Sequence, residues 1–146
     1  MEKQKIMVTL IKFFILFLFS QLLNAQIVSG QDIVIKIDHI DNNKGNIYVA
    51  VYDSKDSFLD KRFKGTISEI NQNSSEVTFK DVPEGVYAIS LFHDENGNGK
   101  MDSNFLGIPS EDYGCSNNAR SFMGPPKWED AKFEVKARAI TQTITL

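Results

Sequence analysis

The sequence predicts an all-β protein: a single antiparallel β-sandwich of about seven strands, with one long ordered loop. Alternation of apolar and polar residues with a period of two recurs along the chain, while helical periodicity is scarce. Clusters of turn-forming residues, such as the stretch 41–45, separate the alternating runs. The chain has 146 residues, which suffices for one domain with one hydrophobic core.

Residues 1–25 are expected to be a cleavable signal peptide. Lys3, Lys5 and Lys12 precede or open the apolar run 13–23, and Ala25 supplies a small residue before the cut. A membrane-spanning helix needs roughly 20 apolar residues, so an uncleaved anchor is the less favoured alternative. We therefore expect an exported protein, periplasmic or extracellular, whose domain comprises residues 26–146 and keeps no stable membrane span.

The charge balance of the expected mature chain argues against nucleic acid as a partner. Without residues 1–25 the chain loses three lysines and Glu2, which leaves 13 basic and 18 acidic residues and a net charge of −5. Binding to a phosphate backbone depends on clustered Lys and Arg, which this sequence lacks. The expected partner is an unidentified molecule of the envelope or of the extracellular space.

Several runs are predicted to be strands. Residues 32–38 and 46–53 each place aliphatic side chains on one face, on either side of the turn 41–45, and are expected to pair as a hairpin. Residues 75–80 form a third strand, and residues 86–93 are so rich in β-formers that a central strand buried on both faces is expected. Two last strands are predicted at 131–137 and 139–146, whereas residues 54–65 are expected to form a helical turn or a loop.

Residues 94–130 are rich in Gly, Asn, Ser and Pro and show almost no periodicity. A compact domain rarely keeps so long an irregular segment unless it carries function. The functional site is expected here.

The start of this segment has the spacing of a calcium-binding loop. Oxygen-bearing side chains stand at positions 1, 3, 5 and 9, a glycine stands at position 6 and a free carbonyl at position 7; these are Asp94, Asn96, Asn98, Asp102, Gly99 and Lys100. Ca²⁺ takes six to eight oxygen ligands, and a tightly curled loop can direct alternate residues toward one point.

The loop is not an EF-hand. Position 12, which should carry a bidentate glutamate, is Phe105, and the residues before the loop predict a strand rather than a helix. Glu111 or Asp112 is the nearest carboxylate able to complete the shell. The competing interpretation is a set of Asn-Gly turns whose side chains cap their own backbone without a metal.

Two other functions are alternatives to a calcium-binding module, an enzyme and a ligand carrier. An envelope enzyme, a metal-assisted hydrolase, would use His93, Asp94, Asp102 and Glu111. Adjacent strand residues face opposite ways, so His93 and Asp94 form no relay by adjacency. A carrier of a small apolar ligand would need an apolar cavity. Cys115 and Trp128 are expected to be buried packing residues.

Four blocks follow one another in an order similar to an exported bacterial family filed as domain of unknown function 2141, at residues 45–52, 82–89, 92–102 and 107–114. The resemblance covers nearly the whole expected mature chain and implies an exported domain without an assigned activity. Residues 82–87 and the loop after residue 93 also resemble, more distantly, immunoglobulin-like and prealbumin-like modules of bacterial surface proteins. Function is therefore expected to be binding or structural, with calcium in the loop 94–102.

Overall fold

The structure is a computed structural model that describes residues 2–4, 6–7, 10–12, 14 and 30–146. Most of the expected signal peptide and its cleavage point lie outside the described residues. Within the described part of the chain, no helix is long and apolar enough to cross a membrane.

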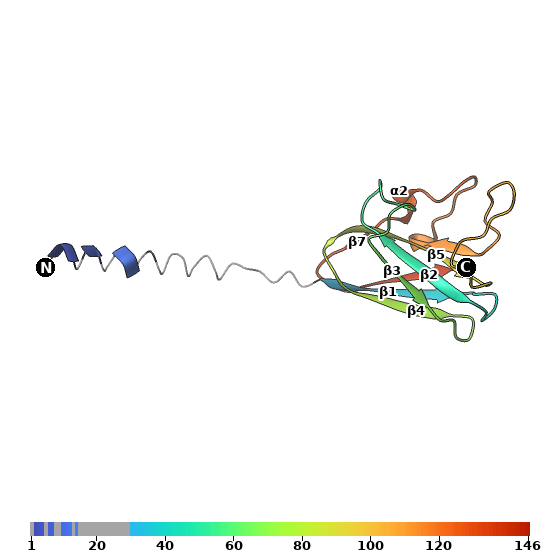
Figure 1. Cartoon of the computed structure of the whole chain (residues 1–146), viewed down its shortest axis with the longest axis horizontal. Helices are drawn as coiled ribbons and strands as arrows, with labels where there is room; N and C mark the ends of the chain where they lie inside the picture. Colours follow the sequence, from blue (N-terminus) through green and yellow to red (C-terminus); the bar gives the residue numbers. More distant parts are fainter. Residues whose placement is uncertain (1, 5, 8–9, 13, 15–29) are drawn as a thin grey trace.

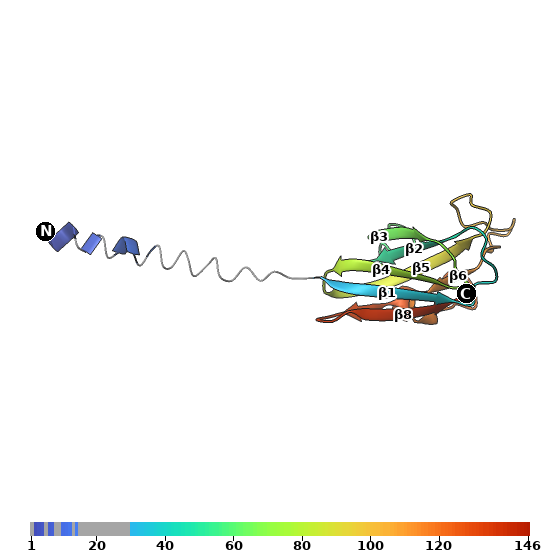
Figure 2. The same cartoon turned by 90° about the horizontal axis from the view of Figure 1, so that it is seen from below.

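Two β-sheets packed face to face form the domain (Figures 1 and 2). Three strands make one sheet, in the order β4-β1-β8, and the other has the order β3-β2-β5-β6 with β7 also paired to β5. The strands are β1 Gln31–Asp38, β2 Asn46–Tyr52, β3 Lys64–Ser68, β4 Ser75–Val82, β5 Gly85–Asp94, β6 Tyr113–Cys115, β7 Phe133–Val135 and β8 Ile140–Thr145. Between β6 and β7 lie a 3-10 turn, η1 Ser116–Asn118, and a one-turn helix, α2 Trp128–Ala131. The predicted all-β sandwich is confirmed.

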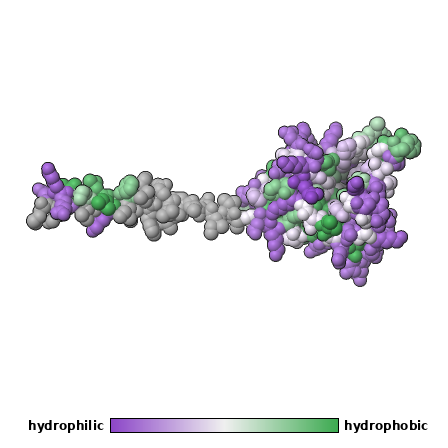
Figure 3. Space-filling view, in the orientation of Figure 1, coloured by the Kyte–Doolittle hydropathy of each residue, from purple (hydrophilic) through white to green (hydrophobic). Residues whose placement is uncertain are grey.

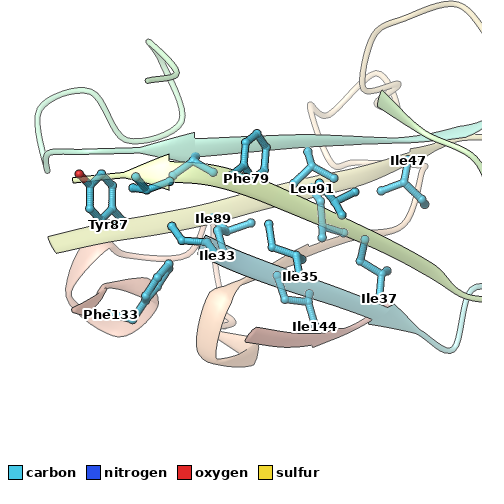
Figure 4. Close-up of a cluster of buried hydrophobic side chains, with 14 of the residues drawn as sticks. Ile33, Ile35, Ile37, Ile47, Phe79, Tyr87, Ile89, Leu91, Phe133 and Ile144 are labelled. Carbon is cyan, nitrogen blue, oxygen red and sulfur yellow. The ribbon is translucent and has the colours of Figure 1, made fainter. Parts of the chain in front are cut away.

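The apolar side chains that alternate along the predicted strands form the core between the two sheets. Each strand directs every second side chain inward, and Figure 4 shows Ile33, Ile35 and Ile37 of β1 facing Ile89 and Leu91 of β5. All five side chains are at most 2% exposed. Burying a side chain of this size stabilises the fold by about 1.5–3 kcal/mol, so this seam holds the two sheets together.

The predicted hairpin of residues 32–38 and 46–53 is wrong. The two strands lie in different sheets: β1 pairs with β4 and β8, whereas β2 pairs with β3 and β5. Between them Ile40 is buried in the core at 2% exposure, and His39 takes a positive φ of 59°. Since both strands carry one apolar face, facing each other across the core satisfies the same pattern as lying side by side.

Strand β5 is central, as predicted, and separates two apolar clusters. Its inner side chains join the core between the sheets, while Ala88 on its outer face belongs to a second, smaller cluster. That cluster contains Cys115 and Ala131 and is covered by Phe58 and Trp128, whose rings meet edge to face at 5.7 Å. The connection after β2 and the helix α2 are thereby held on the outer face of the larger sheet.

Four features of the fold differ from the predicted elements. β3 falls at the end of the segment expected to be irregular, and β6 lies inside the long loop. The strand expected at 131–137 shortens to β7 because α2 includes Ala131 at the start of the predicted strand and Lys136 forms a bridge with Arg138 at its end. β8 pairs with β1 in parallel, whereas the remaining pairings between the strands are antiparallel.

Gly45 is required where the chain enters β2 beside the end of β5. Its φ is +65°, and a Cβ atom there would lie 1.8 Å from the carbonyl oxygen of Asp94. Gly124 has a similar φ of +79° but nothing within 4 Å of its virtual Cβ. Both positions therefore disfavour a side chain through backbone strain, and only Gly45 adds a backbone clash.

We predict that Gly45→Ala lowers the free energy of unfolding by roughly 3 kcal/mol or more, whereas Gly124→Ala costs about 1–2 kcal/mol from strain alone. Urea unfolding of both variants measures the difference. Equal losses would show that the approach of Gly45 to β5 places no constraint on the fold.

Candidate functional site

Asp94 is the last residue of β5 and is 0% exposed. Its carboxylate accepts three backbone N–H groups: Oδ1 from Gly97 at 2.9 Å and Asn98 at 3.1 Å, and Oδ2 from Gly99 at 2.8 Å. A buried carboxylate is costly unless such donors replace water. A carboxylate has about four acceptor positions, so the three bonds leave one free. The loop is therefore wrapped around Asp94.

The two asparagines form successive turns that lead to Asp102. Asn96 Oδ1 accepts the N–H of Asn98 at 3.0 Å, and Asn98 Oδ1 accepts the N–H of Lys100 at 2.8 Å. Their amide Nδ2 groups donate to the carboxylate of Asp102 at 2.5–3.1 Å. The side chains of Asn96 and Asn98, two residues apart, thus converge on the Asp102 carboxylate, as the predicted spacing requires.

Glu111 joins the loop from beyond its end. Its Oε2 accepts the N–H of Asp102 at 3.0 Å, and the N–H of Ser110 bonds to the carbonyl of Asp102 at 2.9 Å. The second oxygen, Oε1, is buried and has no hydrogen-bond partner. A buried acceptor without a donor costs about 1–3 kcal/mol, and more when it is charged.

The atoms that this loop could offer to a metal ion are therefore oxygens. Within the described ranges, no three side chains of His, Cys, Asp or Glu are close enough to hold a metal ion by themselves. A cation would depend on Asn and backbone oxygens as well, which suits calcium rather than zinc. The amide Nδ2 groups of Asn96 and Asn98 occupy three of the roughly four acceptor positions of the Asp102 carboxylate. A cation held by both asparagines and Asp102 would require these amides to turn their oxygens toward it.

All six predicted ligand residues lie in or against this loop. Hydrogen bonds connect Asn96, Asn98, Asp102 and Glu111 directly, and Asp94 holds the same loop from below. Lys100 contributes its backbone to the chain of turns, and its side chain is exposed. Of the two carboxylates proposed to complete the shell, Glu111 reaches the loop, whereas Asp112 is exposed and uses its carbonyl to accept the N–H of His93.

Sequence reasoning missed two residues that position the loop. Gly45 lies against the Asp94 carbonyl, and the hydroxyl of Tyr48 lies beneath Gly99, 3.4 Å from the point where a Cβ would stand. Both contacts depend on the pairing of β2 with β5, in which Asn46 is opposite Asp94. No local spacing in the sequence could signal this pairing.

The structure separates His93 from the carboxylates with which an enzyme would combine it. His93 is 0% exposed on the inner face of β5, opposite to the face of Asp94. Its Nε2 donates to the carbonyl of Lys44 at 2.7 Å, and its Nδ1 is buried without a partner. This arrangement suits a packing residue at the end of the core.

A hollow of about 530 Å³ lies between the free edges of β3 and β4. Its walls are residues 65–68 and 76–80, which include Glu76 and Lys80. The side chain of Lys64 donates to the carbonyl of Lys80 at 2.9 Å, so charged groups stand at the hollow's rim. The walls combine Glu76, Lys80 and polar residues with Ile67, Val77 and Phe79, so this open groove is not the enclosed apolar cavity that a carrier of a small apolar ligand needs.

Cys115 and Ser116 lie beneath α2. The hydroxyl of Ser116 accepts the N–H of Ile89 at 2.9 Å and donates to the carbonyl of Ala131 at 2.5 Å, which ties β5 to the helix. Cys115 is 2% exposed, and burial raises the pKa of its thiol to about 11. The prediction that Cys115 is buried is confirmed, whereas Trp128 is partly buried and packs against the cluster that contains Cys115.

Comparison with known proteins yields one match. A family described as "Uncharacterized protein conserved in bacteria (DUF2141)" matches residues 35–143, which include every residue of the candidate site. No curated protein and no solved structure matches the chain.

We predict that Cys115 is unreactive in the folded protein. A pKa of about 11 in place of 9.0 lowers the thiolate fraction at pH 8 by about 100-fold, and burial restricts access further. Reaction with a chromogenic disulfide reagent at pH 8 should be slow until urea unfolds the chain. Equal rates with and without urea would contradict the buried position.

Proposed function

Because the chain belongs to this uncharacterized bacterial family, which has no assigned activity, we propose its function from the geometry of the site. The protein is an exported, non-enzymatic β-sandwich module of the cell envelope whose loop 94–102 binds calcium. The shell consists of oxygens from Asp94, Asn96, Asn98, the carbonyl of Lys100, Asp102 and Glu111. Export rests on the lysines and apolar run of residues 1–25.

Glu111 Oε1 is the observation that carries the calcium proposal. One oxygen of this carboxylate is bonded to the loop backbone while the other is buried without a donor. A cation is the partner that relieves a charged oxygen at such a place. Glu111 thereby takes the role that position 12 has in an EF-hand loop, from further along the chain.

The charges of the shell predict weak binding. Asp94, Asp102 and Glu111 carry the negative charge of the loop, and the remaining oxygens are neutral. Among the described residues, no three carboxylates lie close enough to act together on one ion, so the charge around a cation is modest. The Asp94 carboxylate already accepts three hydrogen bonds from the loop backbone, which leaves it one acceptor position for a cation. Affinity is therefore expected in the range of extracellular modules, with a Kd of about 10⁻⁴–10⁻³ M. Export supplies the compartment in which such an affinity is useful.

The geometry favours a binding or structural role over an enzymatic one. His93, the side chain best suited to proton transfer near neutral pH, is directed into the core and away from the loop. The loop is held by its own hydrogen bonds around Asp94, and this geometry suits a metal that orders structure.

Calorimetry with added Ca²⁺ tests the shell. We predict measurable binding heat that Glu111→Gln weakens at least about tenfold, since the variant keeps the size of the side chain but removes the charge. Asp112→Asn is the matched control because this neighbouring side chain is exposed and Asp112 bonds to His93 through its backbone carbonyl. The affinity of this variant should stay within about twofold of that of the unchanged protein. No binding heat, together with a melting temperature unaffected by chelator, would overturn the proposal.

Limited proteolysis tests whether calcium orders the long loop. Ordering the backbone costs about 1–2 kcal/mol per residue, and a ligand bound only by the folded state offsets part of that cost. With chelator, trypsin should cut at Lys100 and Arg120 before it cuts at Lys61 and Arg62, which are exposed outside the loop. With calcium in excess the two loop sites should become resistant. Cleavage that is insensitive to calcium at all four sites would contradict this role.

A further inference from the structure

The turn that follows the calcium loop is firmly built. Asn104 organises it: its Oδ1 accepts the N–H groups of Leu106 at 2.9 Å and Ile108 at 3.1 Å, and its N–H donates to the carbonyl of Ile108 at 2.8 Å. Gly107, with a φ of +76°, donates back to the carbonyl of Asn104 at 2.9 Å. Below it, Ser103 forms an antiparallel bridge with Pro109. We call residues 103–110 the tip.

The tip presents apolar side chains to solvent. Phe105 is 95% exposed, Leu106 is 68% exposed and Ile108 is 55% exposed. Figure 3 shows apolar surface projecting from one end of an otherwise largely hydrophilic domain, the end from which the long loop extends in Figure 1. Since hydrogen bonds hold the turn, these side chains are displayed by the fold and do not result from a loose loop.

Charge distinguishes the tip from the surface around it. In a chain in which 24% of residues are charged, residues 103–110 contain no charged side chain. Charged residues begin at the base of the tip, at Asp102 and Glu111, with Lys100 exposed one step further away. A convex, uncharged apolar apex above a charged base matches the layers of a phospholipid surface, in which hydrocarbon lies beneath phosphates.

The base of the tip is also the proposed calcium shell. Asp102 bonds to Ser110 and Glu111 through its backbone, so the two strands of the tip start from two of the ligand residues. Without a cation, residues 94–112 carry five carboxylates and one lysine, a net charge of −4 that opposes contact with lipid phosphates. A bound Ca²⁺ would reduce this charge to −2 and fix the base in one geometry.

We propose that the tip inserts Phe105, Leu106 and Ile108 into the interface of a phospholipid bilayer when the loop is loaded with calcium. This inference rests on the proposed function, because calcium is what makes the base compatible with phosphates. The bilayer is favoured over a protein groove because the apolar surface is convex, uncharged and bounded by ligands of a cation that can itself contact phosphate oxygens.

Vesicle binding of the exported protein tests the inference. Phe105→Trp is mixed with phosphatidylcholine vesicles, with and without 20% phosphatidylglycerol, in calcium or in chelator; the composition is a probe of roughly physiological surface charge. We expect a blue shift of Trp fluorescence and quenching by brominated lipid in calcium only. Ile67→Trp is the positional control, since Ile67 is 54% exposed on β3, away from the tip, and should show neither change.

Co-sedimentation with the same vesicles uses a matched pair of substitutions. Ile108→Ser and Ile67→Ser remove the same side chain at exposures of 55% and 54%. Loss of one such side chain from the interface should weaken binding roughly threefold to tenfold for Ile108→Ser, and adding Phe105→Ser should abolish it. Ile67→Ser should bind like the unchanged protein.

Calorimetry with calcium alone separates the two proposals. The tip variants should bind calcium normally because they alter no ligand. Three outcomes would overturn the lipid inference and leave the calcium site standing. They are calcium binding without vesicle binding, equal losses of vesicle binding for Ile108→Ser and Ile67→Ser, and vesicle binding that persists in chelator. Absence of calcium heat in the unchanged protein would overturn both. Concentration-dependent self-association that Phe105→Ser removes, without vesicle binding, would assign the tip to a second copy of the chain instead.

Discussion

The alternation of strand β5 up to its last residue, Asp94, is the constraint on which the rest of the molecule depends. Inner positions of this strand fill the core between the sheets, and outer positions support the small cluster beneath Trp128. The pleat has a period of two, so the last inner side chain is His93 and the last outer one is Asp94. A carboxylate is thereby delivered, fully buried, to the point where the chain leaves the sheet. The loop that follows must curl around it to supply the N–H groups that water no longer provides.

The carboxylate of Glu111 is brought to the loop by backbone hydrogen bonds further along the chain. Bonds between the backbones of Asp102 and Ser110, and of His93 and Asp112, fold the chain back so that Glu111 lies against the start of the tip. The two carboxylates are unequally satisfied: Asp94 holds three donors, whereas one oxygen of Glu111 has none. Because their hydrogen bonding differs, the two carboxylates have different roles in the proposed site. Asp94 shapes the loop, and Glu111 provides the acceptor that a cation would relieve.

Strands with strong alternation were predictable, as were the buried cysteine and the curl of the calcium-type loop. Strand partners were not. The apolar faces of β1 and β2 fit a hairpin and a pair of facing sheets equally well, and in the second arrangement Ile40 between them is buried. β3 and β6 escaped prediction because they are short and contain Gly65 and Gly114. They are strands because the edges of β2 and β5 offer them hydrogen bonds.

The sequence by itself determined an all-β chain with one long irregular segment and the spacing of oxygen-bearing side chains from Asp94 to Asp102, because these follow from local periodicity and turn chemistry. Only the tertiary structure decided that Glu111, rather than Asp112, reaches the loop, and that His93 is directed into the core. It also placed Gly45 against Asp94 and left the tip exposed. Each of these depends on residues far apart in the chain meeting across a sheet or a turn, and local patterns carry no record of such contacts.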